Sequence, residues 1–282
     1  MEVVEVKREN ATEDVTDTVK EYVSSLSITD SRYQLTPLQH QTSNLHFRLE
    51  TEKANPGTEY FVKHFQRTHF IPVNRQANFT LQRQVADAGY APMPVSLSED
   101  HQIQVEHWVE QEPMNQCSRQ QKVCKAAEVL AHIHQLPICV TEMNLLANWQ
   151  RYLDFIPAHY HDDLCQRMDA CTSIWETSNA LCLCHHDMSF GHIAGLGSNV
   201  IFDWEYAALG DPHFDLACCI LINQLTQPEI QCLLEVYCAY FPSAVESFVT
   251  ENVTKMLPVA LLTNDLWQLA YDNNQAVDSN RG

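Results

Sequence analysis

The spacing of apolar residues changes near residue 109. Before that position, short runs rich in β-branched and aromatic residues predict strands at 33–38, 45–50, 60–65, 95–97 and 103–109. Helical spacing predicts an opening amphipathic helix over 13–27 and a second helix over 74–88, which ends at Gly89. Lys53 to Gly57 has the composition of a hairpin turn. The chain up to residue 109 therefore predicts a small antiparallel sheet carrying one helix.

Beyond residue 109 the apolar positions recur mostly at helical spacing. We predict helices at 117–136, 142–156, 160–178, 213–223, 227–240 and 244–272. The interruption at 180–212 is rich in histidine and aspartate and contains an apolar strand, predicted over Asn199 to Phe202. The fold class expected from this pattern is α+β, with a sheet-rich part over 1–109 and a larger helical part over 110–282.

The charge balance narrows the class of partner. Lys and Arg total 17 against 36 Asp and Glu, which gives a formal net charge of −19, and no basic cluster is longer than a pair. A chain of this kind lacks the electrostatic footprint of a nucleic-acid binder and is a poor partner for anionic membranes. An acidic surface attracts cations, so the composition favours a positively charged small molecule or a divalent metal ion.

The cysteines and the N-terminus favour an intracellular setting. Eleven cysteines are an odd number, Cys-x-x-Cys is absent, and both Cys182-x-Cys184 and Cys218-Cys219 lie in apolar runs. This pattern predicts reduced, mostly buried thiols. His134 lies two residues from His132 on a predicted helix and is expected to pack or cap instead of binding metal. No apolar run approaches the length of a membrane span or signal sequence, so we expect a cytoplasmic protein.

Two aspartates sixteen residues apart carry the clearest chemistry. Asp187 lies in the loop that begins at His185, and Asp203 follows the predicted apolar strand. Phosphoryl transfer uses such a pair, because one carboxylate accepts the proton of the substrate hydroxyl and the other holds Mg²⁺ against the nucleotide phosphates. A metal-dependent hydrolase is less favoured, since a dinuclear centre needs more ligands than residues 185–203 provide.

These segments resemble the aminoglycoside phosphotransferase and choline kinase family. That family has an H-x-D-x-x-x-x-N catalytic loop, matched by the segment from His185, and an I-D-W/F-E segment, matched at Asp203-Trp204-Glu205. Tyr60-Phe-Val-Lys63, Val105 to Val109 and Leu130 to Pro137 match further family segments in the same order. The resemblance covers about residues 30–240. Its most specific part, from Asp203 through Gly-Asp-Pro-x-x-Asp-Leu-Ala, is most like bacterial thiamine kinases and choline or ethanolamine kinases.

The resemblance implies a two-lobed, protein-kinase-like fold that uses ATP and Mg²⁺, or Mn²⁺ as the alternative ion. By position, Asp187 would be the general base, His185 would brace the catalytic loop, and Asp203 would bind the metal ion. Asp215 would also brace that loop, whereas Asp211 before Pro212 is better interpreted as a helix N-cap.

Nucleotide and substrate roles follow from the same resemblance. Lys63 would hold the nucleotide phosphates, and Glu106 and Trp108 belong to the strand that corresponds to the nucleotide-binding hinge. Glu205 and Trp204 would face the cationic end of the substrate, because a carboxylate and an indole both attract a quaternary or thiazolium nitrogen.

The chain departs from the family pattern at three points. His192 replaces the asparagine that would bind a second metal ion, and an imidazole nitrogen suits Mg²⁺ less well than an amide oxygen does. The phosphate-covering segment from Leu35 to Arg48 contains no glycine. No glutamate occurs between Val62 and Ser98 to pair with Lys63.

The favoured function is therefore an ATP-dependent phosphotransferase acting on a hydroxyl of a small cationic metabolite of the thiamine, choline or ethanolamine type. Two alternatives stay open: a kinase-like binding protein with reduced catalysis, and an antibiotic phosphotransferase of the aminoglycoside type. The identity of the alcohol, the nucleotide preference and the oligomeric state are left open by the sequence.

Overall fold

The chain divides into two compact units. The computed structural model describes residues 15–29, 32–38, 44–52, 58–66, 70–71, 73–177 and 181–281. Side chains are described up to residue 274. The first unit, here the sheet unit, comprises Met1–Arg67, Pro92–Val109 and Asn280–Gly282. The second, the helical unit, comprises Thr68–Ala91 and Glu110–Ser279. The functional division into lobes at residue 109 stays a prediction, and the helix expected over 74–88 groups with the helical unit.

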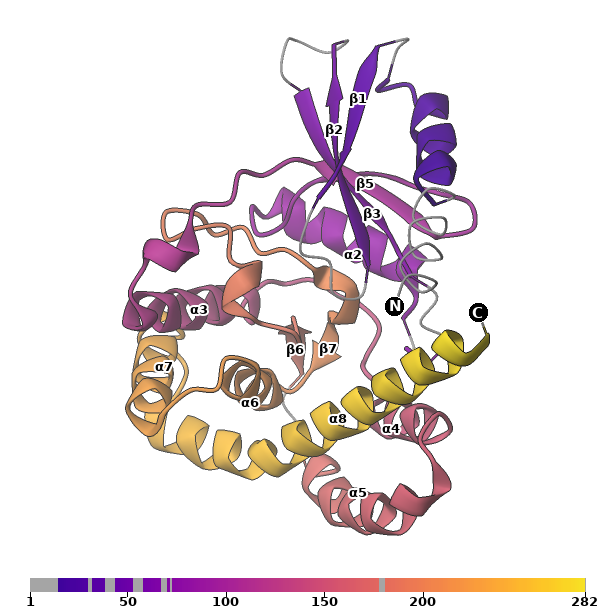
Figure 1. The fold of residues 1–282 in the computed structure, drawn as a ribbon. Coiled ribbons are helices and arrows are strands. Elements are labelled where there is room, and N and C mark those ends of the chain that lie inside the picture. The colour runs from indigo at the N-terminus through magenta and orange to yellow at the C-terminus, as the bar shows by residue number, and fades with distance from the viewer. Residues whose placement is uncertain are drawn as a thin grey trace. The chain divides into compact units, whose positions relative to one another are not determined.

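The sheet unit contains five antiparallel strands in the order β1-β2-β3-β5-β4 (Figure 1). The five predicted strands are confirmed, with these bounds: β1 (Tyr33–Pro37), β2 (Leu45–Thr51), β3 (Thr58–His64), β4 (Pro94–Leu97) and β5 (Ile103–His107). The turn predicted over Lys53 to Gly57, and residues 39–43 of the phosphate-covering segment, lie outside the described residues.

Strand alternation separates two faces of this sheet. Alternate side chains point to opposite faces, so every second residue joins the same layer. One layer is apolar and packs on Val19 and Val23 of the helix that runs through residues 15–25; its strand residues are Phe47, Leu49, Tyr60, Val62, Ile103 and Val105. The other layer is mainly polar and contains His46, Arg48, Phe61, Lys63, Gln104 and Glu106. The helix over residues 15–25 therefore covers the apolar face of the sheet.

The helical unit confirms the predicted run of helices (Figure 1). They are α2 (Arg75–Asp87), α3 (Arg119–Ile133), α4 (Leu145–Leu153), α5 (His161–Trp175), α6 (Pro212–Ile222), α7 (Gln227–Tyr240) and α8 (Glu246–Arg281). Helix α8 continues beyond its predicted end at 272 and contains Pro258. Asp211 caps α6 as predicted, since its side chain accepts the backbone N–H of His213 at 2.6 Å.

The interruption between α5 and α6 folds differently from the prediction. Residues 199–202 do not form a strand; Ile201 makes only an isolated bridge with Ile193, because the backbone turns into a left-handed conformation at Asp203 and then into a 3₁₀ turn, Trp204–Tyr206. The strands here are instead β6 (Cys182–Cys184) and β7 (Ala208–Gly210), which pair antiparallel.

Two apolar clusters fill the helical unit. The first joins α3 and α7 to the segment 183–204 and buries Met188, Ile193 and Ile201. The second surrounds Trp149, whose indole N–H donates to Thr263 at 2.8 Å. Because the side chains of Met188 and Ile193 are buried, the loop over residues 189–192 is anchored in the core at both of its ends. Across the residues described, no helix combines the length and apolar character needed to cross a bilayer.

Candidate active site

Asp187, His192 and Asp203 converge within the helical unit. One ligand atom from each lies within 4.8 Å of the others. His192 is 3.8 Å from Asp187 and 3.9 Å from Asp203, measured from its Nδ1 and Nε2 to the nearer carboxylate oxygens. All three side chains are partly exposed. The two aspartates that are sixteen apart in sequence are thus brought to one point, with the histidine between them.

The loop holds His192 in a defined tautomer. Its Nδ1 lies 2.8 Å from the backbone carbonyl oxygen of Asp187. A carbonyl oxygen only accepts, so Nδ1 carries the proton and Nε2 keeps its lone pair on the Asp203 side. The backbone N–H of Phe202 donates to the carbonyl of His192 at 2.8 Å, which joins the loop to the residue before Asp203. The neutral imidazole is therefore oriented as a ligand nitrogen.

His185 links the two aspartate-bearing segments. The backbone N–H of Asp187 donates to its Nδ1 at 3.2 Å, and its Nε2–H donates to the carbonyl of Phe202 at 3.0 Å. Burial, assisted by the nearby His192, lowers the pKa of His185 to about 4. The ring is fully buried and neutral at physiological pH. The His185 ring thus holds the backbone of the loop at Asp187 and the backbone next to Asp203 at a fixed separation. Its catalytic role stays a prediction.

Asp215 of α6 holds the start of the loop. Its two carboxylate oxygens accept the backbone N–H groups of His185 at 2.7 Å and His186 at 2.8 Å. His134 Nε2 is 3.1 Å from the same carboxylate. Burial alone would raise the pKa of Asp215, but the hydrogen bond from His134 and the nearby His186 hold it below its usual value. This buried carboxylate is satisfied by three donors and stays ionised.

Sequence reasoning missed further residues around this site, and two of them, Asn223 and Gln111, contact the loop. The Asn223 side chain donates to the carbonyl of Met188 at 2.8 Å and accepts the backbone N–H of Phe190 at 2.9 Å. Gln111 donates to the carbonyl of Gly191 at 2.8 Å. Asn223 is the C-cap of α6 and Gln111 lies in an irregular segment, so no spacing pattern connects either residue to the loop.

The third missed residue is Arg75 at the start of α2. Burial lowers the pKa of its guanidinium, while the nearby carboxylates of Glu205 and Asp203 oppose that shift. A half-buried cation therefore lies near the predicted metal and substrate carboxylates. Asn78, one turn later on α2, donates its side-chain amide to the backbone carbonyls of Trp204, at 3.1 Å, and Glu205. Helix α2 thus fixes the turn that follows Asp203.

Trp204 does not suit the predicted substrate role. Its side chain is only 2% exposed, within the first apolar cluster. The indole N–H donates to the carbonyl of Ile201 at 2.8 Å, and the ring meets the His185 ring edge-on at 4.9 Å. The prediction treated Trp204 as an exposed aromatic surface, whereas the 3₁₀ turn directs it into the core. Glu205, the next residue, is partly exposed, and its substrate role stays a prediction.

The predicted nucleotide residues lie in the sheet unit. Lys63 is paired with Gln104 across β3 and β5, and Glu106 is two residues further along β5, so all three share the polar face of the sheet. Gln104 donates to the Glu106 carboxylate at 3.1 Å. Trp108 lies after β5, with the Arg48 guanidinium 4.9 Å above its ring. Their roles in nucleotide binding stay predictions.

Comparison with known proteins identifies the family. The model of the phosphotransferase enzyme family matches residues 34–243, which include the loop from His185, Asp203 and Lys63. The chain belongs to this family. This phosphotransferase thus has the paired aspartates of the site in the region that the family model covers. A search of curated proteins finds no match.

Solved structures share the fold of this phosphotransferase at low sequence identity. A choline/ethanolamine kinase family protein from Mesorhizobium loti is 21% identical, with a TM-score of 0.69 over 92% of this chain and 88% of its own. Choline kinase LicA from Streptococcus pneumoniae is 19% identical, with a TM-score of 0.64 over 93% and 99%. The structure of a gentamicin–APH(2'')-IIa complex is 14% identical, with a TM-score of 0.60 over 91% of each chain. The phosphotransferase therefore has the fold common to choline kinases and aminoglycoside phosphotransferases.

Proposed function

We propose that this phosphotransferase transfers the γ-phosphoryl group of ATP to a hydroxyl of a small cationic metabolite of the thiamine, choline or ethanolamine type. The choice of a cationic substrate is supported by a cluster of aromatic side chains that lies next to acidic side chains. The cluster consists of Tyr206, Trp267 and Tyr271, which are all partly exposed and lie within the helical unit.

The geometry of this aromatic cluster suits a cation. Trp267 stacks on Tyr271, with centroids 5.1 Å apart and planes 9° from parallel, and its indole N–H donates to the Tyr206 hydroxyl at 3.1 Å. Glu205 directly precedes Tyr206, and His186, the residue before Asp187, lies with its Nδ1 3.0 Å from the Tyr206 carbonyl oxygen. Burial and the charges of Glu205 and Asp187 raise the pKa of Tyr206. Aromatic faces and carboxylates attract a quaternary or protonated nitrogen together. In this proposal the aromatic cluster binds the cationic end of the substrate, which is the role that the sequence analysis predicted for Trp204.

The site residues divide the chemistry between them. Asp187 accepts the proton of the substrate hydroxyl, the hydroxyl oxygen forms a bond to the γ-phosphorus, and the bond from that phosphorus to the bridging oxygen of ADP breaks. Asp203 and His192 hold a divalent ion, and the bound ion would neutralise charge on the phosphates. Carboxylate oxygens fit Mg²⁺, while the Nε2 lone pair of His192 suits Mn²⁺ better.

The sheet unit supplies the nucleotide side of the proposal. Lys63 on the polar face of β3 binds the α- and β-phosphates, and Glu106 and Trp108 border the adenine. The support is the order of these segments, which follows that of the family, and the mainly polar character of this face, opposite the apolar layer that packs on residues 15–25. The N-terminal 109 residues would thus bind the nucleotide, and the rest would bind the substrate and carry the catalytic loop.

The experiment is an ADP-release assay of the full chain with ATP and either Mg²⁺ or Mn²⁺. Thiamine, choline, ethanolamine and gentamicin are tested as acceptors, with glycerol as an uncharged alcohol. We expect release that depends on one of the three metabolites and disappears in Asp187→Asn. Preference for gentamicin would establish the antibiotic phosphotransferase instead. Equal turnover of glycerol would overturn the cationic substrate class, and acceptor-independent release would overturn the proposal.

A matched pair of variants tests the aromatic cluster. Trp267→Leu should raise the KM for the cationic acceptor at least tenfold and leave the KM for ATP unchanged, because the proposal places the indole against the acceptor and not against the nucleotide. Trp175→Leu is the control, since Trp175 packs on Phe214 and lies outside the aromatic cluster. Similar acceptor KM values in the two variants would show that the cluster is only part of the core.

A further inference from the structure

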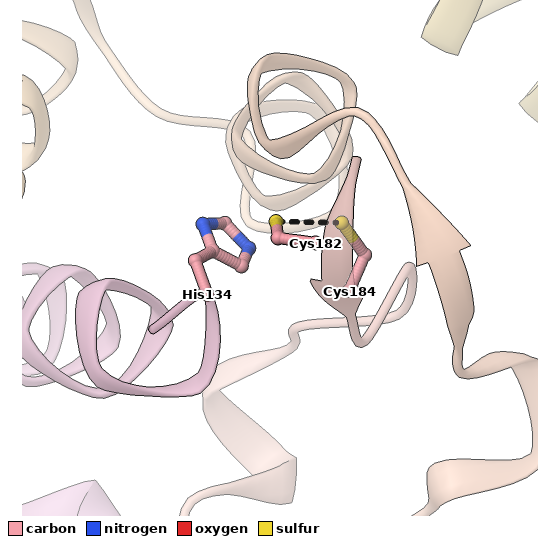
Figure 2. Close-up of side chains that lie close together, drawn as sticks. All are labelled: His134, Cys182 and Cys184. Atoms are coloured by element: carbon pink, nitrogen blue, oxygen red, sulfur yellow. Dashed lines mark hydrogen bonds between the residues drawn. The ribbon is translucent and has the colours of Figure 1, made fainter. Parts of the chain in front are cut away.

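Three metal-binding side chains face one another at a place that the proposed phosphotransfer does not use. They are His134, at the C-terminal end of α3, and Cys182 and Cys184 on β6 (Figure 2). One ligand atom from each lies within 4.8 Å of the others. The two cysteines are alternate residues of one strand, so both thiols project from the same face of β6.

The separation of the sulfur atoms matches a shared metal ion. The Sγ atoms of Cys182 and Cys184 are 3.7 Å apart. Two thiolates at 2.3 Å from a tetrahedral zinc ion would be separated by about 3.8 Å. The cysteines of this strand therefore lie at the separation that such an ion requires, without a change in the strand. Cys124 and Cys232 are equally close, at 3.6 Å, but no third ligand accompanies them in the described clusters.

The histidine is oriented by partners on both ring nitrogens. His134 Nδ1 is 2.9 Å from the Tyr237 hydroxyl, and Nε2 is 3.1 Å from the Asp215 carboxylate. Whichever nitrogen binds an ion, the other keeps its hydrogen bond. Histidine ligands in metal sites almost always have such a second partner, which fixes the ring and strengthens the ligand nitrogen.

Charge and access also favour a cation. The Asp215 carboxylate, 3.1 Å from His134 Nε2, puts a negative charge beside the three side chains. Cys182 is partly exposed and follows the exposed Leu181, so the site can be reached from solvent, whereas Cys184 is fully buried.

We propose that His134, Cys182 and Cys184 form a binding site for a thiophilic divalent ion of the Zn²⁺ class. The three side chains provide one nitrogen and two sulfur ligands, and a water molecule completes the tetrahedron. The set of ligands is soft, in contrast to the carboxylate-rich set at Asp187 and Asp203, so the two sites select different ions. The site is joined to the catalytic loop, because β6 continues into His185 and Asp215 contacts both His134 and that loop.

Cobalt(II) provides a direct test that does not depend on activity. The reduced full chain is titrated with Co²⁺, and the thiolate-to-cobalt absorption distinguishes the sulfur ligands from the carboxylate-rich site, which contains no thiol. We expect one equivalent to bind with thiolate-to-cobalt charge-transfer absorption and the intense visible bands of tetrahedral Co²⁺. Added Zn²⁺ should displace the cobalt and remove both signals.

Cysteine variants then assign the signal. Cys182→Ser should lose the charge-transfer absorption and weaken Co²⁺ binding at least tenfold, while Cys124→Ser and the exposed Cys139→Ser should behave like the parent. Cys182 is the primary position because its partial exposure makes the variant compatible with folding, which far-ultraviolet circular dichroism checks. Absence of the absorption in the folded parent would overturn the proposal. So would its retention in Cys182→Ser or its loss in Cys124→Ser.

Discussion

The Asp215 carboxylate on α6 accepts the backbone N–H of His185 at 2.7 Å, at the first residue of the catalytic loop. Its other oxygen accepts the N–H of His186, which has a positive φ of 63°. A non-glycine residue in that conformation needs support from its surroundings. Helix α6 therefore fixes the direction in which the chain leaves β6 and so the position of Asp187.

Asp215→Asn should destabilise the protein and slow catalysis together. An amide has only one acceptor oxygen, so one of the two buried backbone N–H groups loses its partner, at a cost of about 1–3 kcal/mol. We expect a lower urea midpoint and a reduced kcat with little change in the KM for ATP. Asp211→Ala is the control: it removes the N-cap of the same helix, costs about 1 kcal/mol, and should leave kcat near that of the parent. Equal effects on kcat would contradict a specific role for Asp215.

Asp187→Asn and Asp203→Ala should fail at different steps. The first removes the group that accepts the hydroxyl proton, so turnover should be abolished while metal-dependent nucleotide binding stays nearly intact. The second removes a ligand of the ion that holds the phosphates, so binding of ATP with Mg²⁺ should itself weaken. Isothermal titration calorimetry with a non-hydrolysable ATP analogue measures the difference. Equal losses of binding in the two variants would contradict these roles.

His192→Asn should change the preferred ion. The imidazole Nε2 is oriented toward Asp203 by the bond from Nδ1 to the Asp187 carbonyl, so the parent should favour Mn²⁺ over Mg²⁺. An asparagine replaces that nitrogen with an amide oxygen. The variant should shift toward Mg²⁺, which activity titrations with each ion would show. An unchanged ion preference would mean that His192 is only a loop residue.

Stability of the ion-free chain should fall as the pH is lowered from 6.5 toward 4. His185 has a pKa of about 4 in the fold and about 6.5 in the unfolded chain, so in this range only the unfolded state takes up its proton. The difference corresponds to at most about 3 kcal/mol. The lowered pKa of His186 acts in the same direction, and Asp215, whose pKa is also held below its usual value, adds to the loss from about pH 5 downward, where unfolded carboxylates begin to protonate. Urea unfolding in EDTA tests this, and a flat profile would contradict it. His185→Asn should reduce the slope.

Local patterns predicted much of this fold. The strand positions, the helices after residue 109 and the cap at Asp211 follow from alternation, helical periodicity and N-cap chemistry, which involve residues close in sequence. The pairing of Asp187 with Asp203 was suggested by their spacing around an apolar run and by the needs of phosphoryl transfer, and the family resemblance assigned their separate roles. The strand predicted at 199–202 was wrong because an apolar run does not reveal the left-handed turn that stops pairing at Asp203.

Contacts between distant residues were not predictable. The link from His134 to Asp215 spans 81 positions, and Asn223 lies 33 residues from the N–H of Phe190. No periodicity connects such pairs. The burial of Trp204, which does not suit its predicted place against the substrate, likewise depends on a residue distant in sequence, since its ring packs edge-on against His185.

Asp203 has a φ of 64°, a backbone conformation that aspartate adopts less readily than glycine or asparagine. Selection for stability alone would therefore favour Asp203→Gly, which relaxes the backbone but removes the carboxylate. A chain that had lost catalysis and needed only its fold would be free to make that exchange. The aspartate at this position thus marks a trade-off in which function opposes conformational preference. It argues that this protein is a working enzyme and against a catalytically silent descendant of one.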